Sequence, residues 1–393
     1  MTITIPESVV AILQRLEDAG YETWCVGGAI RDALANDAHQ DVDLATAAPP
    51  EIVRGMFRRT IAVGVEHGTV GVLDDVGVLH EVTTFRRDVK TDGRHAVVEF
   101  GVSLDDDLAR RDFTINAIAY HPLRHEWRDP FEGRADFQAG IVRAVGDPVA
   151  RFREDRLRIL RALRFAARFG FSIEAATWQA ARDQAADTGH LSAERVRDEW
   201  VKGIKSAQSL DALVQRWVDS GVTQVWLPEC HPPDPTRTAE SLPNAPADRD
   251  AIRATARYCS PSASVWRRFK GSNTEIQRAD AIDRGPARPA SAAPRDVRRW
   301  MSMVGAAVED LRLLAIWRGD DGDDWPAVVE RVRALGEATS RGELAITGND
   351  LVAAGIPAGP ELGRILGRLL DVVLDDPALN TREVLLARAT TGA

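Results

Sequence analysis

Two aspartates separated by one residue lie in the stretch VGGAIRDALANDAHQDVDLAT, residues 26–46. If this part of the chain is a strand, side chains at i and i+2 project from the same face, so Asp41 and Asp43 present two carboxylates side by side. Two like charges this close repel each other, but a hard divalent cation such as Mg²⁺ favours carboxylate oxygens. Two metal ions on such a pair can activate an attacking hydroxyl group and stabilise a leaving pyrophosphate. We therefore predict that Asp41 and Asp43 are catalytic metal ligands.

A glycine pair and an arginine precede the aspartates. Gly27 and Gly28 let backbone N–H groups approach a phosphate, ahead of a helix whose N-terminus favours negative charge. Arg31, in the first turn of that helix, can bind a phosphate oxygen. A lone D-x-D or G-G is usually a solvated turn, but here the two occur in strand–turn–helix–strand order. The combination predicts a triphosphate held by the glycines and Arg31, with its metal ions on the aspartates.

The elements that must position these residues predict a mixed α/β unit over about the first 130 residues. Apolar residues recur at helical spacing in residues 6–19, and Gly20 follows as a stop signal. DVDLAT alternates as a strand, with Val42 and Leu44 facing away from the aspartates. The other expected helices are RDALAN and PPEIVRGMFR, and the other expected strands are ETWCV, TIAVGV, GTVGVLDD, GVLHEVTTF and AVVEFGV.

After about residue 140 the pattern becomes helical. ARFREDRLRILRALRFAARFGF and SAERVRDEWVKGIKS favour helices, and so does the chain from about residue 310, with a break at GIPAGPELG. Residues 228–249 and 284–295 are rich in proline and predict loops.

Composition limits the classes of protein that are possible. The formal net charge of -9 argues against general nucleic-acid binding, yet residues 141–171 carry eight arginines and three acids, a local excess suited to phosphate. No apolar run approaches a membrane span, and no secretory signal is evident. Cys25, Cys230 and Cys259 are far apart in sequence and form no zinc or disulfide pattern, which favours a cytoplasmic protein.

Several motifs together resemble those of the class II tRNA nucleotidyltransferases and bacterial poly(A) polymerases, within the polymerase-β-like nucleotidyltransferase superfamily. GGAIRD with DVDLAT is similar to the first motif of this family, and RRDFTINAIAY at 110–120 to its second. Residues 129–171 resemble the family's neck, SAERVRDEW the following helix, and residues 346–370 the tail of CCA-adding enzymes. Only about 230–310 shows no likeness.

The resemblance implies addition of C, C and A to tRNA 3′ ends from CTP and ATP with Mg²⁺, without a nucleic-acid template. Asp155 and Arg158 of REDRLR match the family residues that read the Watson–Crick edge of the incoming base. Residues i and i+3 share one face of a helix, which agrees with this role. A carboxylate acceptor and a guanidinium donor suit cytosine or adenine and misfit uracil and guanine.

Further residues match nucleotide-binding positions of the family: Arg111, Asp112, Asn116, Arg161 and Arg164. From the residues alone, Asn116 could equally be a satisfied core amide, and the arginines of the neck an ordinary solvated face. Glu81 in HEVTTF follows on a predicted strand and is either a third carboxylate or a partner for an arginine.

Three alternatives to complete CCA addition remain open from the sequence. Residues 86–99, RRDVKTDGRHAVVE, lie where the family carries a flexible loop needed to switch from C to A, and they are shorter than that loop, which leaves a partial CC- or A-adding enzyme possible. A poly(A) polymerase would be expected to carry a basic C-terminus, which VLLARATTGA is not. A catalytically inactive RNA-binding protein is disfavoured by the intact aspartates.

The expected fold class is α+β, a nucleotidyltransferase head with a small sheet followed by all-helical parts. We expect a catalytic head at 1–138, a neck for base recognition at 139–206, a body at 207–310 and a tRNA-binding tail at 311–393. The turn GNDLVAAGIPAGPELG suits either the RNA backbone at the tRNA elbow or a plain helix–helix connection. The expected partners are tRNA, CTP and ATP, with no membrane, and the protein is expected to be a monomer or homodimer.

Overall fold

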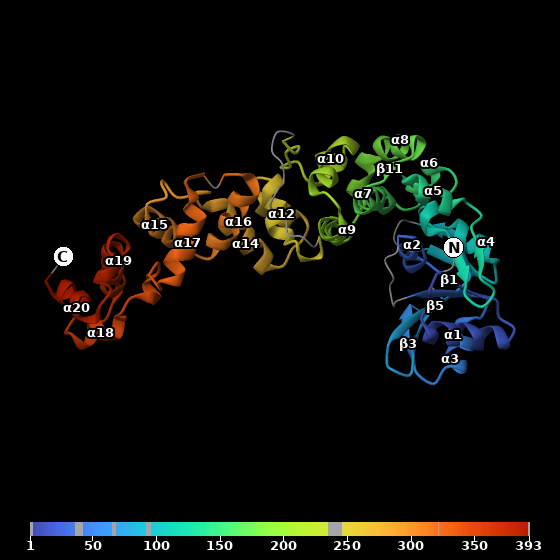
Figure 1. The fold of residues 1–393 in the computed structure, drawn as a ribbon, viewed down its shortest axis with the longest axis horizontal. Coiled ribbons are helices and arrows are strands. Elements are labelled where there is room, and N and C mark those ends of the chain that lie inside the picture. The colour runs from blue at the N-terminus through green and yellow to red at the C-terminus, as the bar shows by residue number, and fades with distance from the viewer. Residues whose placement is uncertain are drawn as a thin grey trace. The chain divides into compact units, whose positions relative to one another are not determined.

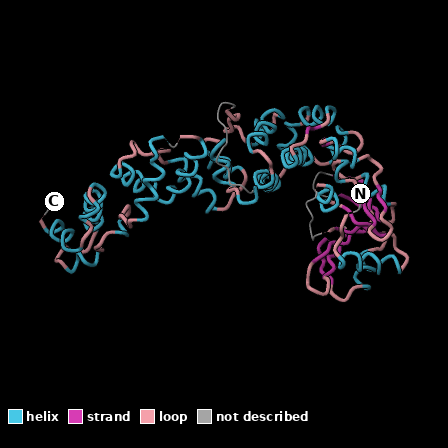
Figure 2. The backbone as a smooth tube through the Cα atoms, viewed as in Figure 1, coloured by secondary structure: helices cyan, strands magenta, loops and turns pink. Residues whose placement is uncertain are grey.

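The computed structural model describes residues 3–35, 42–64, 68–91, 96–234, 246–320 and 322–391. Contacts divide the chain once, into Met1–Pro228 and Glu229–Ala393, which are the first and second units below. The first unit contains the strands, and the second unit, where it is described, is helical (Figures 1 and 2). None of the helices in the described ranges is long and apolar enough to span a membrane.

A seven-stranded sheet within the described residues forms the centre of the head, in the order β3-β4-β5-β2-β1-β8-β9. Neighbouring strands are antiparallel except β2 and β5, which are parallel. The strands are β1 (Thr23–Val26), β2 (Asp43–Thr46), β3 (Thr60–Gly64), β4 (Thr69–Leu73), β5 (Leu79–Thr84), β8 (Ala119–His121) and β9 (Glu126–Arg128).

The two faces of this sheet pack against different partners. One face is covered by α1 (Glu7–Asp18), α2 (Gly28–Leu34) and α3 (Pro50–Met56), whose apolar residues join those of the strands in one core. The predicted stripe of α1 is confirmed, since its buried residues are Val9, Ile12, Leu13 and Leu16. The other face carries a smaller core with α4 (Leu104–Ala109), and this face also bears Asp43.

The segment expected as a flexible loop, residues 86–99, contains a second strand. Strands β6 (Arg86–Thr91) and β7 (Ala96–Phe100) pair antiparallel, with Arg86 opposite Phe100. Strand β7 was predicted from AVVEFGV, whereas β6 was not. RRDVKT, with four charged and two β-branched residues, suits a strand as well as a loop, so only its pairing with β7 distinguishes the two. Residues 92–95 lie outside the described residues.

Helices follow the head in the first unit. They are α5 (Gly133–Ala139), α6 (Pro148–Glu154), α7 (Leu157–Phe169), α8 (Ala175–Asp183), α9 (Ala193–Ser206), α10 (Leu210–Ser220) and α11 (Thr223–Trp226). One short parallel pair, β10 (Ile141–Val142) with β11 (Ser172–Ile173), lies among them. Helix α7 ends at Gly170, whose φ of 70° allows the left-handed turn that closes it.

The second unit contains α12 (Ala251–Tyr258), α13 (Ser262–Arg268), α14 (Asn273–Arg284), α15 (Pro294–Val304), α16 (Val308–Arg318), α17 (Trp325–Ala334), α18 (Gly348–Ala353), α19 (Pro360–Asp375) and α20 (Arg382–Thr390). The predicted break at GIPAGPELG contains the turn between α18 and α19, and its last four residues begin α19. A separate apolar core runs from Ala338 to Leu385, later than the expected start of the tail at 311. The division into four parts stays a prediction, because the contacts separate the chain only at Pro228 and keep α10 and α11 with the neck.

Candidate active site

Asp43 opens β2 on the face of the sheet that is turned away from α1, α2 and α3. It lies opposite Val26 in the antiparallel pairing of β1 with β2. Its chain neighbours Val42 and Leu44 are 2% and 0% exposed in the core on the opposite face. The predicted alternation is therefore confirmed for these three residues. Asp41 lies outside the described residues, so its part in the carboxylate pair stays a prediction.

Gly27 is packed directly against the carboxylate of Asp43. Its φ of 86° and ψ of -153° belong to a region of backbone conformation that is essentially restricted to glycine. A Cβ atom at this position would lie 2.8 Å from Asp43 Oδ2. Gly28 is the first residue of α2, so the glycine pair is the turn between β1 and α2, as predicted. This contact is a second reason why position 27 is a glycine, because any side chain there would displace Asp43.

Glu81 lies on the strand that neighbours Asp43. Strands β2 and β5 are parallel, with Leu44 paired to Val82. Because alternate residues of a strand face opposite sides, Glu81 and Asp43 project from the same face, one residue before this pair. The geometry is consistent with a third carboxylate near Asp43, and its metal-binding role stays a prediction.

Arg111 belongs to the second motif, and the charge of Asp43 affects its pKa. Its Nη2 donates to Asp107 Oδ2 at 3.2 Å and its Nη1 to the carbonyl of Asn116 at 3.4 Å. Burial lowers the pKa of Arg111, while the charges of Asp107 and Asp43 act to raise it. Its Nε is buried and has no hydrogen-bond partner among the residues described. A buried donor without a partner, close to a carboxylate, is a position where an anionic ligand oxygen can bind.

Arg31 is enclosed between the head and α7. It is 4% exposed, and its guanidinium contacts Asp32 at 2.7 Å and Asn116 Oδ1 at 2.5 Å. It also lies over the rings of Phe165 and Phe169, 4.8 and 5.1 Å from their centroids. These contacts hold the glycine turn against the neck. A phosphate oxygen would have to compete with them, and the predicted phosphate contact of Arg31 stays a prediction.

Asp112 and Asn116 connect the second motif to α7. The side chain of Asn116 donates to Asp112 Oδ1 at 2.8 Å, and Arg161 Nε donates to Asp112 Oδ2 at 2.6 Å. Burial acts to raise the pKa of Asp112, but the charge of Arg161 and hydrogen bonds from Asn116, Arg161 and the Phe113 N–H outweigh it and lower the pKa to about 2. Asn116 uses its amide oxygen for Arg31 and its amide nitrogen for Asp112. It is a satisfied buried amide that also positions two predicted site residues.

Arg161 and Arg164 share an acid on α9. Arg164 Nε donates to Glu199 Oε2 at 2.6 Å, and Arg161 Nη1 lies 3.9 Å from Glu199 Oε1. Burial acts to lower the pKa of Arg161, but the charges of Asp112 and Glu199 raise it, whereas burial leaves the pKa of Arg164 lowered. Arg164 is 8% exposed and is held within the neck, while a third of the Arg161 side chain is open to solvent.

Asp155 and Arg158 do not lie on one continuous helix, contrary to the expectation from their spacing. Asp155 ends α6 with an extended backbone, and α7 begins at Leu157. Asp155 Oδ2 accepts from Arg195 at 2.8 Å, whereas Arg158 Nη1 donates to Glu154 at 2.7 Å. The break arises because Asp155 Oδ1 accepts from the Leu157 N–H at 3.0 Å, as an aspartate does at the start of a helix.

Sequence reasoning missed three acids that organise these arginines. Asp32 bonds both Arg31 and, across 136 residues, Arg168 at 2.9 Å. Asp107 and Glu199 are 0% and 3% exposed and pair with the arginines described above. Only Asp107 carried a local signal, since an acid four residues before an arginine on a helix favours an ion pair.

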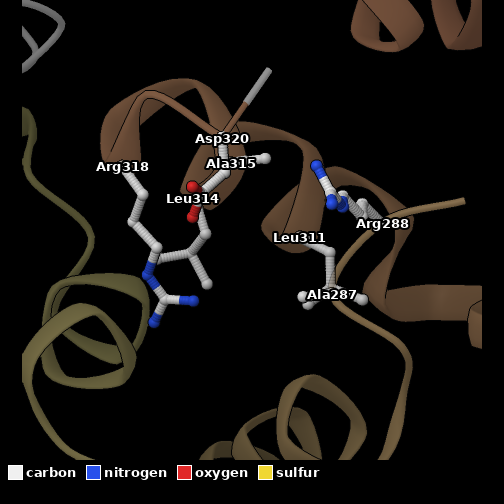
Figure 3. A pocket seen from close by; sticks show the side chains of 7 residues that line it. All are labelled: Ala287, Arg288, Leu311, Leu314, Ala315, Arg318 and Asp320. Carbon is white, nitrogen blue, oxygen red and sulfur yellow. The ribbon is translucent and has the colours of Figure 1, made fainter. Parts of the chain in front are cut away.

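The second unit contains a cavity of about 270 Å³, lined by residues between Ala287 and Asp320. Figure 3 shows an apolar floor with Arg288 and Arg318 on different sides of the opening. The Arg318 guanidinium donates to the carbonyl of Ala256 at 2.6 Å, so it also holds α16 to α12. The cavity is lined by Ala287, Arg288, Leu311, Leu314, Ala315, Arg318 and Asp320.

Three protein-family models match parts of this chain. The poly A polymerase head domain matches residues 23–143, a probable RNA- and SrmB-binding site of polymerase A matches 170–232, and tRNA nucleotidyltransferase domain 2 matches 263–389. The matched head contains Gly27, Asp43 and Arg111. Fold and site thus define a nucleotidyltransferase with a poly(A) polymerase-type head, and the predicted family resemblance is confirmed.

Relatives along the whole chain give the narrower class. The chain is 36% identical to the CCA-adding enzyme of Leuconostoc mesenteroides, over 95% of this chain and 93% of that protein. It is 34% identical to that of Lacticaseibacillus paracasei, over 99% and 98%. A crystal structure of the Bacillus stearothermophilus CCA-adding enzyme with CTP is 31% identical, with a TM-score of 0.76 over 98% of this chain and 97% of that one. This chain belongs to the family of CCA-adding enzymes.

Proposed function

We propose that this chain adds C, C and A in turn to the 3′ end of tRNA, using CTP and ATP and releasing pyrophosphate. The observation that supports this most directly is the joint placement of Asp43 and Arg111. The Asp43 carboxylate, at the start of β2 and packed against a glycine turn, acts through its charge to raise the pKa of Arg111, whose buried Nε has no hydrogen-bond partner among the described residues. A carboxylate for metal and a donor for a triphosphate are two of the groups that nucleotidyl transfer uses.

Nucleotidyltransferases of this family generally use a divalent metal ion, and we propose Mg²⁺. The residues present fit such an ion: Asp43 supplies hard oxygen ligands, Glu81 projects from the same face, and Asp41 completes the predicted pair. Bound Mg²⁺ would favour ionisation of the tRNA 3′ hydroxyl and neutralise charge on the pyrophosphate. Arg111 would bind a triphosphate oxygen through its Nε. The turn Gly27–Gly28 would place backbone N–H groups near the same phosphates.

The neck residues would select the base and hold the nucleotide. Asp155 and Arg158 would read the Watson–Crick edge after exchanging Arg195 and Glu154 for the base. Arg161, which is partly open to solvent, would contact the nucleotide, and Asp112 and Asn116 would orient it. Arg31, which is buried, would act mainly by holding the head to the neck, and the buried Arg164 by joining α7 to α9 within the neck.

The remaining parts would bind the tRNA. We propose that the acceptor arm lies along the first unit and the tRNA elbow at the tail around the turn between α18 and α19. We further propose that the protein acts in the cytoplasm as a monomer or homodimer.

The decisive experiment incubates purified protein and Mg²⁺ with a tRNA transcript that lacks its 3′ CCA. CTP alone, ATP alone and both together are supplied, and products are sized at single-nucleotide resolution. The proposal expects C-C from CTP and one further A when both are present. C-C addition that stops there would point to a partial enzyme, a ladder of A from ATP to a poly(A) polymerase, and no product to an RNA-binding protein.

Two variants separate the roles of the proposed residues. Asp43→Asn should abolish transfer while tRNA binding is retained, and Asp75→Asn, in the exposed turn before β5, is the matched control that should change neither. Asp155→Ala should keep transfer but admit UTP and GTP. Arg195→Ala removes the same ion pair from its other side, so it should keep the choice of base. Retained discrimination in Asp155→Ala would contradict base reading by this carboxylate.

A further inference from the structure

Two of the three cysteines, 29 positions apart in the sequence, face each other in the second unit. Cys230 and Cys259 are direct partners in an isolated antiparallel bridge. The His231 N–H donates to the Tyr258 carbonyl at 2.7 Å, and the Ser260 N–H to the Glu229 carbonyl at 3.1 Å. These two bonds flank the cysteines, so the cysteines themselves form a non-hydrogen-bonded pair of the antiparallel ladder.

This type of pair has the spacing that a disulfide requires. Directly opposed Cα atoms at a non-hydrogen-bonded position lie about 4.5 Å apart, with the side chains on the same side. Disulfides span Cα separations of roughly 4.4 to 6.8 Å. A bond between Cys230 and Cys259 would therefore need little movement of the backbone.

Both thiols are free in this structure, and they differ in access to solvent. Cys259 is 1% exposed, whereas Cys230 is only half-buried. A hydrogen bond with the Cys230 side chain, together with burial, raises the pKa of the Cys259 thiol, which agrees with the pairing of the two cysteines in the bridge. The remaining cysteine, Cys25, is 0% exposed in the head and belongs to the other unit.

We propose that Cys230 and Cys259 form a reversible intramolecular disulfide when the protein meets a peroxide. The thiolate of Cys230, the more accessible sulfur, attacks one oxygen of hydrogen peroxide, which breaks the O–O bond and gives a sulfenic acid and, after protonation, water. The thiol of Cys259 then attacks the sulfenic sulfur, loses its proton and displaces hydroxide, which together leave as water. Two thiols are oxidised, one peroxide is reduced to two waters, and a dithiol reductant reverses the reaction.

The bond would join the first residues of the second unit to the end of α12. Glu229 is already held at this place by Arg268, through contacts of 2.5 and 2.8 Å. The disulfide would close a loop that contains all of residues 231–258. Closing a loop restricts the unfolded chain, so the oxidised second unit should resist unfolding more than the reduced one.

The test treats the full-length protein with hydrogen peroxide, then alkylates it under denaturing conditions and maps its peptides. We expect loss of two alkylatable thiols, a Cys230–Cys259 peptide pair, an unmodified Cys25 and complete recovery with dithiothreitol. Cys25→Ser is the matched control and should behave like the natural chain, whereas Cys230→Ser and Cys259→Ser should form no intramolecular bond. The oxidised protein should also show a higher midpoint of thermal unfolding in α12. This midpoint is measured by hydrogen exchange of α12 peptides at increasing temperature.

Three results would overturn the inference. They are a dimer linked through Cys230, over-oxidation of Cys230 with Cys259 left as a thiol, and three free thiols after treatment. Each can be read without any assay of nucleotide addition, so the inference stands or falls separately from the proposed function.

Discussion

Substitution of Gly27 by alanine tests the contact between the glycine turn and Asp43. An alanine here must adopt a φ of 86° and a ψ of -153°, a strained conformation that costs on the order of 1–3 kcal/mol of stability. The new Cβ would lie 2.8 Å from Asp43 Oδ2, while ordinary contact begins at 3.4 Å. The carboxylate must therefore retreat by the difference, about 0.6 Å, or the turn must shift by as much.

The displacement sets the expected loss of activity. A misplacement of about 1 Å in a reacting geometry can cost 10²-fold, so we expect kcat to fall by roughly tenfold to a hundredfold. In free energy this is about 1.4 to 2.7 kcal/mol of transition-state stabilisation. The Kd for tRNA should stay unchanged, because Gly27 packs against Asp43, the proposed metal ligand, and is not among the residues proposed to bind tRNA.

The assay is single-turnover addition of C from CTP, with the urea midpoint of unfolding measured on the same samples. Gly20→Ala is the matched control: its φ of 87° is also positive and strains an alanine, but nothing lies within 4 Å of the added Cβ. It should lose stability and keep kcat. Equal kcat in the Gly27→Ala and Gly20→Ala variants would refute the argument that Gly27 makes room for the Asp43 carboxylate.

Two other substitutions test the packing around the site. Asp112 has a pKa lowered from 3.8 to about 2, so its ionised form adds about 2 kcal/mol of stability that is fully present above pH 3.8 and is lost as the pH falls through about 2. Asp112→Asn should lower the free energy of unfolding at pH 7, measured in urea, by at least this amount, because Arg161 loses its hydrogen-bond partner. An acid transition like that of the wild type in this variant would contradict the assignment of the stability to the Asp112 carboxylate. Gly133→Ala would place a Cβ 2.0 Å from the Thr114 carbonyl oxygen, and we expect a loss of about 1–3 kcal/mol or more by the same method. Gly55→Ala, in α3 with open space around it, should instead gain about 0.5–1 kcal/mol, and similar effects of the two alanines would disprove the steric reasoning.

Local features of this protein were readable from its sequence. The stripe of α1, the alternation around Asp43 and the glycine turn before α2 follow from the periods of helix and strand and from the backbone freedom of glycine. The motifs were sufficient to predict the family. Each of these signals lies within one continuous stretch of sequence, so no knowledge of the folded chain was needed.

Two expectations drawn from local sequence were wrong because a single contact changed the backbone conformation. REDRLR contains neither glycine nor proline and reads as helix, yet the Asp155 carboxylate captures the Leu157 N–H and separates α6 from α7. Strand β6 likewise depends on its pairing with β7. In the first case a side-chain contact two residues along the chain selects the conformation, and in the second a paired strand does.

The sequence by itself determined which residues could do chemistry; the tertiary structure decided which of them share contacts. Arg31 reaches Asn116 across 85 residues, Asp32 reaches Arg168 across 136, and Cys230 meets Cys259 through a bridge that no spacing rule indicates. Spacing encodes geometry only within one helix or strand. Which buried arginine meets which acid is fixed by packing and strand register, because a buried charge is stable only where the fold brings its partner to it.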